Sequence, residues 1–369
     1  MKALTVLKSF CTNKLSFSSE KELINDHSHV KTLHSGVIRG ETPVYVHTRT
    51  QLTFSYLDFI KKEFGENLHF GLDHCGEQLL KFVCEDCGFV ELIRKGCKIR
   101  NLCPVCARNY THLKVNHAWD SVFSKFAMSK KYYLMHLVFT VPKEFRDLIF
   151  EDSSRFFHVI YKTLKRYMGK DELVGGVASL HLFGSSDFEV KPHIHVLIPN
   201  VNFSKKKGDL GFFKRKRPYF NVSQLRFNYM IEFHDEFGGG LKRKNVYVNY
   251  VKMRDMDRVL HRLRYTFRKP IENVYPMIEG ANGNLSLSEW ENISRVLSFN
   301  GKRIRWFGFL ADGVKSKYLA LGGISYERFS DWLVREESKE KNCPECGGVM
   351  VYVGKTYEFL EEGLFIIDT

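Results

Sequence analysis

The stretch KPHIHVLIPN, residues 191–200, places His193 and His195 at the start of an apolar run. Alternate side chains of a β-strand share a face, so both imidazoles point to one side and Ile194 points to the other. Two imidazoles in this arrangement can chelate one metal ion, but strand histidines also occur as hydrogen-bonded core residues. The stretch therefore predicts a strand and leaves both roles open.

The neighbouring segments predict a mixed α+β fold. Residues 133–141 form a β-rich apolar run closed by Pro142, and residues 153–168 carry apolar side chains at helical spacing. Residues 177–183 and 193–198 read as two strands joined by the turn GSSDFEVK, which favours an antiparallel hairpin. The histidine pair then lies on the second strand of this hairpin, and His181 lies on the first.

A basic helix is predicted over residues 252–269, ended by Pro270. Its expected buried stripe consists of Met253, Met256, Leu260, Leu263 and Phe267. Tyr265 lies on another face, with four neighbours one turn away: His261, Arg262, Arg268 and Lys269. A phenol among cations is suited to attack a phosphodiester, because the cations favour the phenolate and neutralise developing charge. The alternative is an interface tyrosine on a solvated basic face.

Cysteine spacing indicates structural zinc. Two Cys-x-x-Cys pairs separated by fifteen residues suggest a four-thiolate site made by Cys84, Cys87, Cys103 and Cys106. A redox or merely buried set of cysteines is the alternative, and Cys75 and Cys97 either substitute as ligands or lie idle. No Cys or His follows Cys343 and Cys346, so we do not expect a second complete zinc site there.

Charge indicates a polyanionic partner. The chain has 56 Lys and Arg against 42 Asp and Glu, a net charge of +14 that favours nucleic acid or an acidic membrane surface. Cations alternate with aromatic residues in one segment: Lys205, Lys206, Lys207, Phe212, Phe213, Lys214, Arg215, Lys216 and Arg217. This mixture suits single-stranded DNA, with cations on phosphates and rings on bases; a solvated loop with its aromatic rings packed inward is the alternative.

Two absences complete these expectations. No stretch approaches the roughly 20 apolar residues that span a bilayer, so we expect a soluble, cytoplasmic protein without a membrane partner. Residues 348–356 resemble a phosphate-binding loop, but Gly348 lies one residue too far from Gly354 for that motif. We therefore expect no nucleotide hydrolysis by this chain.

The order FTVP at 139–142, HLFGS at 181–185, KPHIHVLIP at 191–199 and RYTFRKPI at 264–271 resembles the motif layout of HUH single-strand endonucleases. These are rolling-circle replication initiators and transposases, and the likeness is greatest to members with an N-terminal cysteine-rich module. The resemblance implies an HUH palm, a central antiparallel sheet with flanking helices, plus a small N-terminal zinc-ribbon-like module. The domains expected are residues 1–72 of unknown role, a zinc module at 73–112, a nuclease at 130–275 and a C-terminal region at 276–369.

The resemblance also implies roles for the residues. His193 and His195 bind Mg²⁺ or Mn²⁺, with His181 as the expected third ligand and Asp187 or Glu189 as runners-up. Tyr265 is the nucleophile, Arg268 or Lys269 stabilises charge, and His261 helps to deprotonate Tyr265 or pairs with phosphate. His261 stands where two-tyrosine members have a second tyrosine, which favours a single nucleophile.

Three functions are open at this stage. The first is a replication initiator, prokaryotic, viral or plasmid-encoded, that nicks an origin and depends on a separate helicase and host replication proteins. The second is a rolling-circle transposase that uses the same chemistry. The third is a zinc-ribbon nucleic-acid-binding protein without catalysis, in which the histidines belong to the core.

Overall fold

The computed structural model describes residues 44–46, 52–127, 133–169, 171–184, 187–212, 221–239, 241, 245–311, 315–321, 325–338, 341–359 and 363–367. The chain divides into two compact units. The first comprises the described residues up to Tyr110, together with Val274–Ser286 and those from Phe329 onward. The second comprises Thr111–Asn273 and Leu287–Arg328.

A five-stranded antiparallel sheet forms the centre of the second unit. Its order is β10 (Val246–Lys252), β4 (Tyr133–Thr140), β7 (Val190–Pro199), β6 (Gly176–Phe183) and β11 (Ile304–Phe307). The strands predicted at 133–141, 177–183 and 193–198 are confirmed, and so is the antiparallel β6–β7 pairing. A smaller sheet contains β5 (Glu172–Val174), β8 (Val201–Ser204) and β9 (Asp209–Phe212).

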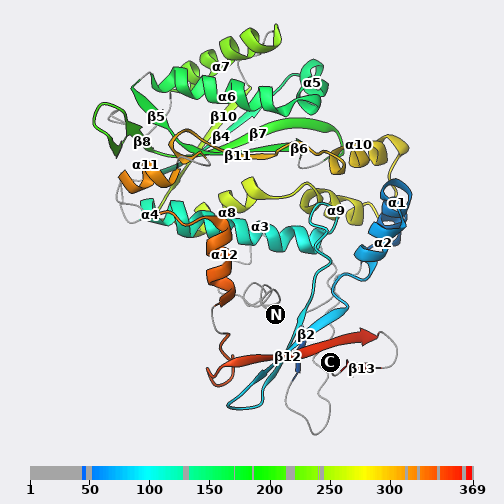
Figure 1. Cartoon of the computed structure of the whole chain (residues 1–369). Helices are drawn as coiled ribbons and strands as arrows, with labels where there is room; N and C mark the ends of the chain where they lie inside the picture. The colour runs from blue at the N-terminus through cyan, green and yellow to red at the C-terminus, as the bar shows by residue number, and fades with distance from the viewer. Residues whose placement is uncertain are drawn as a thin grey trace. The chain divides into compact units, whose positions relative to one another are not determined.

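Helices cover both faces of this sheet (Figure 1). On one face lies α6 (Ser153–Met168), which coincides with the predicted helix and packs against α7 (Val222–Phe237). The other face contacts α8 (Met256–Phe267). The α8 helix begins later than predicted, because the Asp255 side chain caps it by accepting a hydrogen bond from the Arg258 backbone N–H at 3.4 Å. Met256 is consequently exposed and does not belong to the buried stripe.

The remaining elements of the second unit are short. They are a π-helical turn at Trp119–Phe123, α4 (Ser124–Ala127), a 3₁₀ turn at Lys143–Phe145, α5 (Arg146–Glu151), α10 (Leu287–Leu297), a 3₁₀ turn at Gly308–Leu310 and α11 (Lys315–Leu321). Two helices, α3 (Pro104–Ala118) and α9 (Ile271–Gly280), run from one unit into the other.

The first unit contains the cysteines and a second five-stranded sheet. Its order is β1 (Val44–Val46), β3 (Val90–Arg94), β2 (Gln78–Cys84), β12 (Met350–Phe359) and β13 (Gly363–Ile367). Helices α1 (Phe54–Phe64), α2 (Glu66–Asp73) and α12 (Phe329–Ser338) belong to the same unit. The segment that resembled a phosphate-binding loop lies largely within strand β12.

This division corrects the expected domain boundaries. The C-terminal region predicted at 276–369 is split, because β11 extends the sheet of the second unit whereas β12 pairs with β2 in the first. The cysteine-rich module is therefore built from both the N-terminal and the C-terminal parts of the chain. Among the described residues, no helix is long and apolar enough to cross a membrane.

Gly308 offers a test of this architecture. Its φ is +63°, and a Cβ there would lie 1.5 Å from the carbonyl oxygen of Val174. We expect Gly308→Ala to destabilise the second unit by roughly 2–5 kcal/mol, combining the left-handed backbone cost with steric strain. Thermal unfolding followed by circular dichroism would measure the loss. Gly211→Ala is the matched control, because nothing lies within 4 Å of a Cβ at that position, and an equal loss in both variants would contradict the structure.

Candidate metal and nucleophile site

Three histidines meet on one face of the central sheet. His181 on β6 lies directly opposite His193 on β7, and His195 follows two residues later on the same face. Their ligand nitrogens all lie within 4.8 Å of one another. The structure thus brings together the three residues that the sequence predicts as metal ligands.

Each of these imidazoles is held through one ring nitrogen. His193 Nδ1 lies 2.7 Å from the Lys191 carbonyl oxygen, and His181 Nε2 lies 3.3 Å from that of Thr266. A carbonyl only accepts, so each of these nitrogens carries the proton and leaves the other one with a lone pair. Histidine ligands of metals are typically oriented in this way. The two rings are therefore prepared to coordinate an ion.

His195 is held by another histidine, His136 on β4, which was not among the residues predicted for the site. His195 Nδ1 lies 2.8 Å from His136 Nε2, and the two rings stack with centroids 5.0 Å apart. His195 Nε2 is buried without a hydrogen-bond partner among the described residues. An orphaned buried nitrogen is costly, and a metal ion at this position would satisfy it, so the residues fit such an ion.

The surroundings keep these imidazoles uncharged. Burial is the largest cause that lowers the pKa of His181, His193 and His195, and the charge of Arg268 adds to this effect at His181 and His195. Burial, followed by the charge of Arg262, lowers the pKa of His136 to about 4. Neutral imidazole is the form that binds metals.

The two acidic runners-up for the third ligand are engaged elsewhere. Lys191 Nζ lies 2.6 Å from Asp187 and 2.9 Å from Glu189, and Glu189 also pairs with Arg146 at 2.6 Å. These ion pairs hold the turn between β6 and β7. The geometry therefore favours His181 as the third partner of the pair.

Tyr265 lies against this cluster. Its ring centroid is 5.0 Å from that of His195 and 5.4 Å from that of His181. The guanidinium of Arg268 lies 4.8 Å from the Tyr265 ring centre. A phenol, three imidazoles and a cation thus converge from β6, β7, α8 and the residue that directly follows α8.

The other two residues predicted to act with Tyr265 are His261 and Lys269. His261 is exposed one turn before Tyr265, and its pKa is lowered by partial burial and by Arg262, Arg264 and Arg268. The backbone N–H of Lys269 donates to the Glu272 carboxylate at 2.8 Å, which helps to begin α9.

The cysteines form two groups of four, which corrects the predicted quartet. The first group contains Cys75, Cys97, Cys103 and Cys106, and the second contains Cys84, Cys87, Cys343 and Cys346. In the first, Cys75 Sγ lies 3.5 Å from Cys103 Sγ, and Cys97 Sγ lies 3.7 Å from Cys106 Sγ. Either group can bind a structural metal such as zinc. Cys84 and Cys87 therefore do not share a site with Cys103 and Cys106.

The first cysteine group has a backbone made to fit it. A Cβ on Gly96 would lie 2.6 Å from Cys106 Sγ, so only glycine lets the chain pass this close to the sulfur. Cys103 directly precedes α3, where Pro104 occupies the first helical position.

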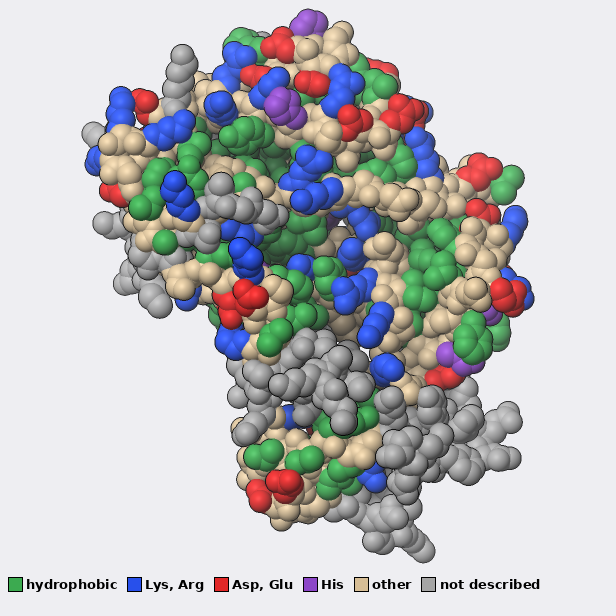
Figure 2. Space-filling view, in the orientation of Figure 1, with side chains coloured by type: hydrophobic (Ala, Val, Ile, Leu, Met, Phe, Trp, Pro, Cys, Tyr) green, Lys and Arg blue, Asp and Glu red, His purple; other side chains and the backbone are tan. Residues whose placement is uncertain are grey.

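The basic segment is described in part. Lys205, Lys206 and Lys207 are exposed in the turn between β8 and β9, and Lys206 pairs with Asp171 at 2.7 Å. The predicted contacts at Phe213, Lys214, Arg215, Lys216 and Arg217 lie outside the described residues, as does the side chain of Phe212. Lys and Arg side chains are numerous on the face shown in Figure 2.

A cavity of about 730 Å³ lies on the opposite face of the sheet from the histidines. Its lining includes Ala178 and Arg305, which pair with each other across β6 and β11, together with Phe157 and Tyr161 of α6. Ala178 alternates with His181 along β6 and so points away from it. This cavity is separate from the histidine site.

Comparison with family models, with curated proteins and with solved structures finds no match for this chain. The functional argument therefore depends on the geometry of the site.

Metal binding tests the third ligand. His181→Ala removes one of three imidazoles, so we expect Mn²⁺ binding to weaken by at least about 100-fold. Isothermal titration calorimetry with Mn²⁺ would measure the affinity. Glu189→Gln is the matched control and should bind Mn²⁺ as the unaltered chain does. Loss of binding with Glu189→Gln, and none with His181→Ala, would make the turn carboxylate the ligand.

The pH dependence of stability tests the burial of His136. Its pKa falls from 6.5 to about 4 on folding, so the unfolded chain takes up a proton that the folded chain resists. Stability should then fall as the pH drops from 6.5 towards 4, by up to about 1.4 kcal/mol per pH unit for this group. His136→Gln should reduce the slope of unfolding free energy against pH, measured by urea unfolding without added Mn²⁺. An unchanged slope would show that His136 does not carry this effect.

Proposed function

We propose that this protein is a metal-dependent endonuclease that nicks and rejoins single-stranded DNA through Tyr265, as a rolling-circle replication initiator. The observation that carries the proposal is the contact of Tyr265 with the three-histidine cluster, at ring-centroid distances of 5.0 and 5.4 Å. Histidines that served only to fill a core would not require the phenol of Tyr265 beside them, with the guanidinium of Arg268 against its ring. The geometry also supports the resemblance to HUH endonucleases drawn from the motifs.

The proposed reaction transfers a phosphoryl group to the phenol. The Tyr265 oxygen attacks the scissile phosphorus and loses its proton, a tyrosine–phosphate bond forms, and the bond to the 3′-oxygen breaks. The released 3′-oxygen takes a proton and becomes a 3′-OH that can prime synthesis. Attack by a 3′-OH on the phosphotyrosine reverses the step and rejoins the strand.

His181, His193 and His195 would hold Mg²⁺ or Mn²⁺. When bound, the ion would supply Lewis-acid polarisation of the scissile phosphate and a template for its orientation. The set of three nitrogen ligands favours Mn²⁺ over Mg²⁺, because Mg²⁺ prefers oxygen ligands. His136 would fix the orientation of His195 through their hydrogen bond.

The remaining residues act on charge and protons. Arg268, 4.8 Å from the Tyr265 ring centre, opposes the negative charge that develops on the phosphate. His261 lies one helical turn before Tyr265, and its lowered pKa keeps it neutral and able to accept the phenol proton. Zinc in the first cysteine group would hold the chain around Cys97 and Cys103 in its folded form.

Substrate recognition would use positive charge and aromatic rings. The exposed Lys205–Lys207 turn and the basic segment after it are proposed to follow the phosphate backbone of single-stranded DNA. Strand separation would require a separate helicase and host replication proteins. A transposase would use the same residues, and the presence of His261 in place of a second tyrosine favours the initiator.

Tyr265→Phe tests the proposal. With a single-stranded origin oligonucleotide and Mn²⁺, the unaltered chain should form a protein–DNA adduct that survives denaturant, visible as a shifted band on a denaturing gel. Tyr265→Phe should abolish the adduct, because the nucleophilic oxygen is gone, while DNA affinity changes by less than about threefold.

Tyr250→Phe is the matched control. Tyr250 pairs with Met135 on β4, one residue from His136, so it points to the other face of the sheet and its loss should leave the adduct unchanged. Adduct formation by Tyr265→Phe would refute the nucleophile, and absence of any adduct from the unaltered chain would favour a binding protein without catalysis.

A further inference from the structure

The second cysteine group joins two distant parts of the chain at one end of the β2–β12 pair. Cys84 Sγ lies 3.5 Å from Cys346 Sγ, and Cys87 Sγ lies 3.6 Å from Cys343 Sγ. A disulfide requires a sulfur separation of about 2.05 Å, so these cysteines are not disulfide-bonded. Four sulfurs around one zinc ion, each about 2.3 Å from it, lie about 3.8 Å apart. The observed spacing therefore matches a tetrahedral thiolate site.

The two halves of this group have the same backbone design. In each, a glycine directly after the second cysteine has a positive φ, +71° at Gly88 and +79° at Gly347. Each glycine N–H donates to the carbonyl oxygen of the first cysteine, at 3.0 Å from Gly88 to Cys84 and 2.9 Å from Gly347 to Cys343. Tight turns of this kind aim both sulfurs of a pair at one point.

A further hydrogen bond repeats in both halves. The Cys84 N–H donates to the Phe89 carbonyl oxygen at 2.8 Å, and the Cys343 N–H donates to the Gly348 carbonyl oxygen at 2.6 Å. In each case the first cysteine closes the turn that contains the second. Two matched turns that face each other make a built site, which chance proximity of four thiols would not produce.

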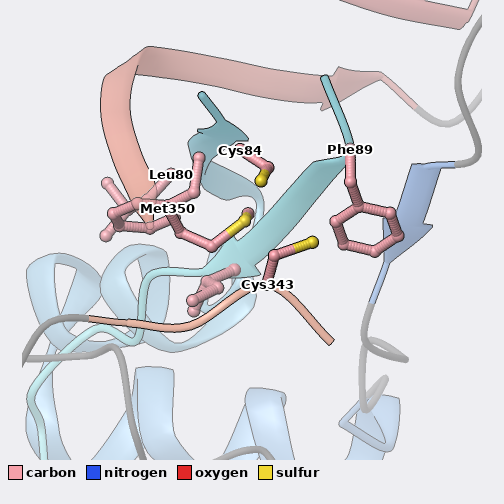
Figure 3. Packing of buried hydrophobic residues seen from close by; sticks show 7 residues of the cluster. Leu80, Cys84, Phe89, Cys343 and Met350 are labelled. Carbon is pink, nitrogen blue, oxygen red and sulfur yellow. The ribbon is translucent and has the colours of Figure 1, made fainter. Parts of the chain in front are cut away.

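The hydrophobic cluster beneath the site contains few residues. Leu80, Phe82, Phe89, Ile93 and Met350 form the buried cluster with Cys84 and Cys343 (Figure 3). Met350, the first residue of β12, pairs with Cys84, the last of β2. A core of this size supplies little stabilisation by itself, and small modules commonly rely on a metal.

We propose that Cys84, Cys87, Cys343 and Cys346 bind a second zinc ion, which fastens strand β12 to strand β2. The cysteines that it joins are 256 and 262 residues apart in the paired contacts. Cys75 and Cys106 of the first group are only 31 residues apart. The second ion therefore holds the C-terminal part of the chain in the module, and its binding free energy becomes folding free energy of that sheet. This inference does not depend on the nicking reaction.

Metal content and strand protection together test the inference. Zinc content of the full chain, purified with zinc, is measured by inductively coupled plasma mass spectrometry, and Cys346→Ser should contain one zinc ion fewer than the unaltered chain. Backbone amides of β12 should exchange at least about tenfold faster in Cys346→Ser, because their strand loses its anchor. Cys97→Ser is the matched comparison: it should also lose one zinc ion but keep the protection of β12.

Cys346→His distinguishes the loss of a zinc ligand from misfolding of the serine variant. Histidine is an accepted zinc ligand, so this variant should retain as many zinc ions as the unaltered chain and a protected β12. The proposal is overturned if Cys346→Ser holds as many zinc ions as the unaltered chain. It is equally overturned if Cys346→Ser loses an ion while exchange in β12 stays unchanged.

Discussion

The antiparallel register of β6 and β7 is the constraint on which the candidate site depends. It sets His181 directly opposite His193 and leaves His195 two residues further along the same face. A shift by one residue would turn His193 and His195 away from His181, because strand side chains alternate. Both strands are interior to the five-stranded sheet, with β4 and β11 as their outer neighbours, so the pairing is held from both sides. A rigid sheet of this kind positions ligands more precisely than loops do.

Helix α8, which carries Tyr265, packs on the same face of the sheet as the histidines. Leu263 and Phe267 are buried, and the Thr266 carbonyl oxygen accepts from His181 Nε2. The helix is thus bound to the histidine cluster through its own backbone, one residue from the tyrosine. Arg268 follows in extended conformation directly after the helix ends, and from there its guanidinium reaches the Tyr265 ring. The position of the nucleophile and the orientation of one metal ligand are therefore coupled.

Local patterns predicted the elements of this site but not all of its contacts. Period-two alternation predicted the shared face of His193 and His195, and helical spacing predicted α6 to the residue. His136 was missed, because its contact with His195 depends on the β4–β7 register, which a single strand sequence does not determine. Its position within an apolar strand beside FTVP was the only signal. Met256 was assigned to the core because periodicity does not show where Asp255 caps the helix.

The cysteine groups show the same limit over longer distances. Spacing along the chain favoured Cys84 and Cys87 with Cys103 and Cys106, but strand pairing brings residues near 345 closer to Cys87 than those near 105. A signal for the correct pairing was present: Cys87 and Cys346 are both followed by glycine, whereas Cys106 is followed by alanine. Glycine adopts the left-handed backbone of such a turn at the least cost, and the two turns that carry this glycine meet in the structure. The spacing of the cysteines predicts how many thiolates each turn presents. The residue that follows the second cysteine of each pair indicates which two turns meet.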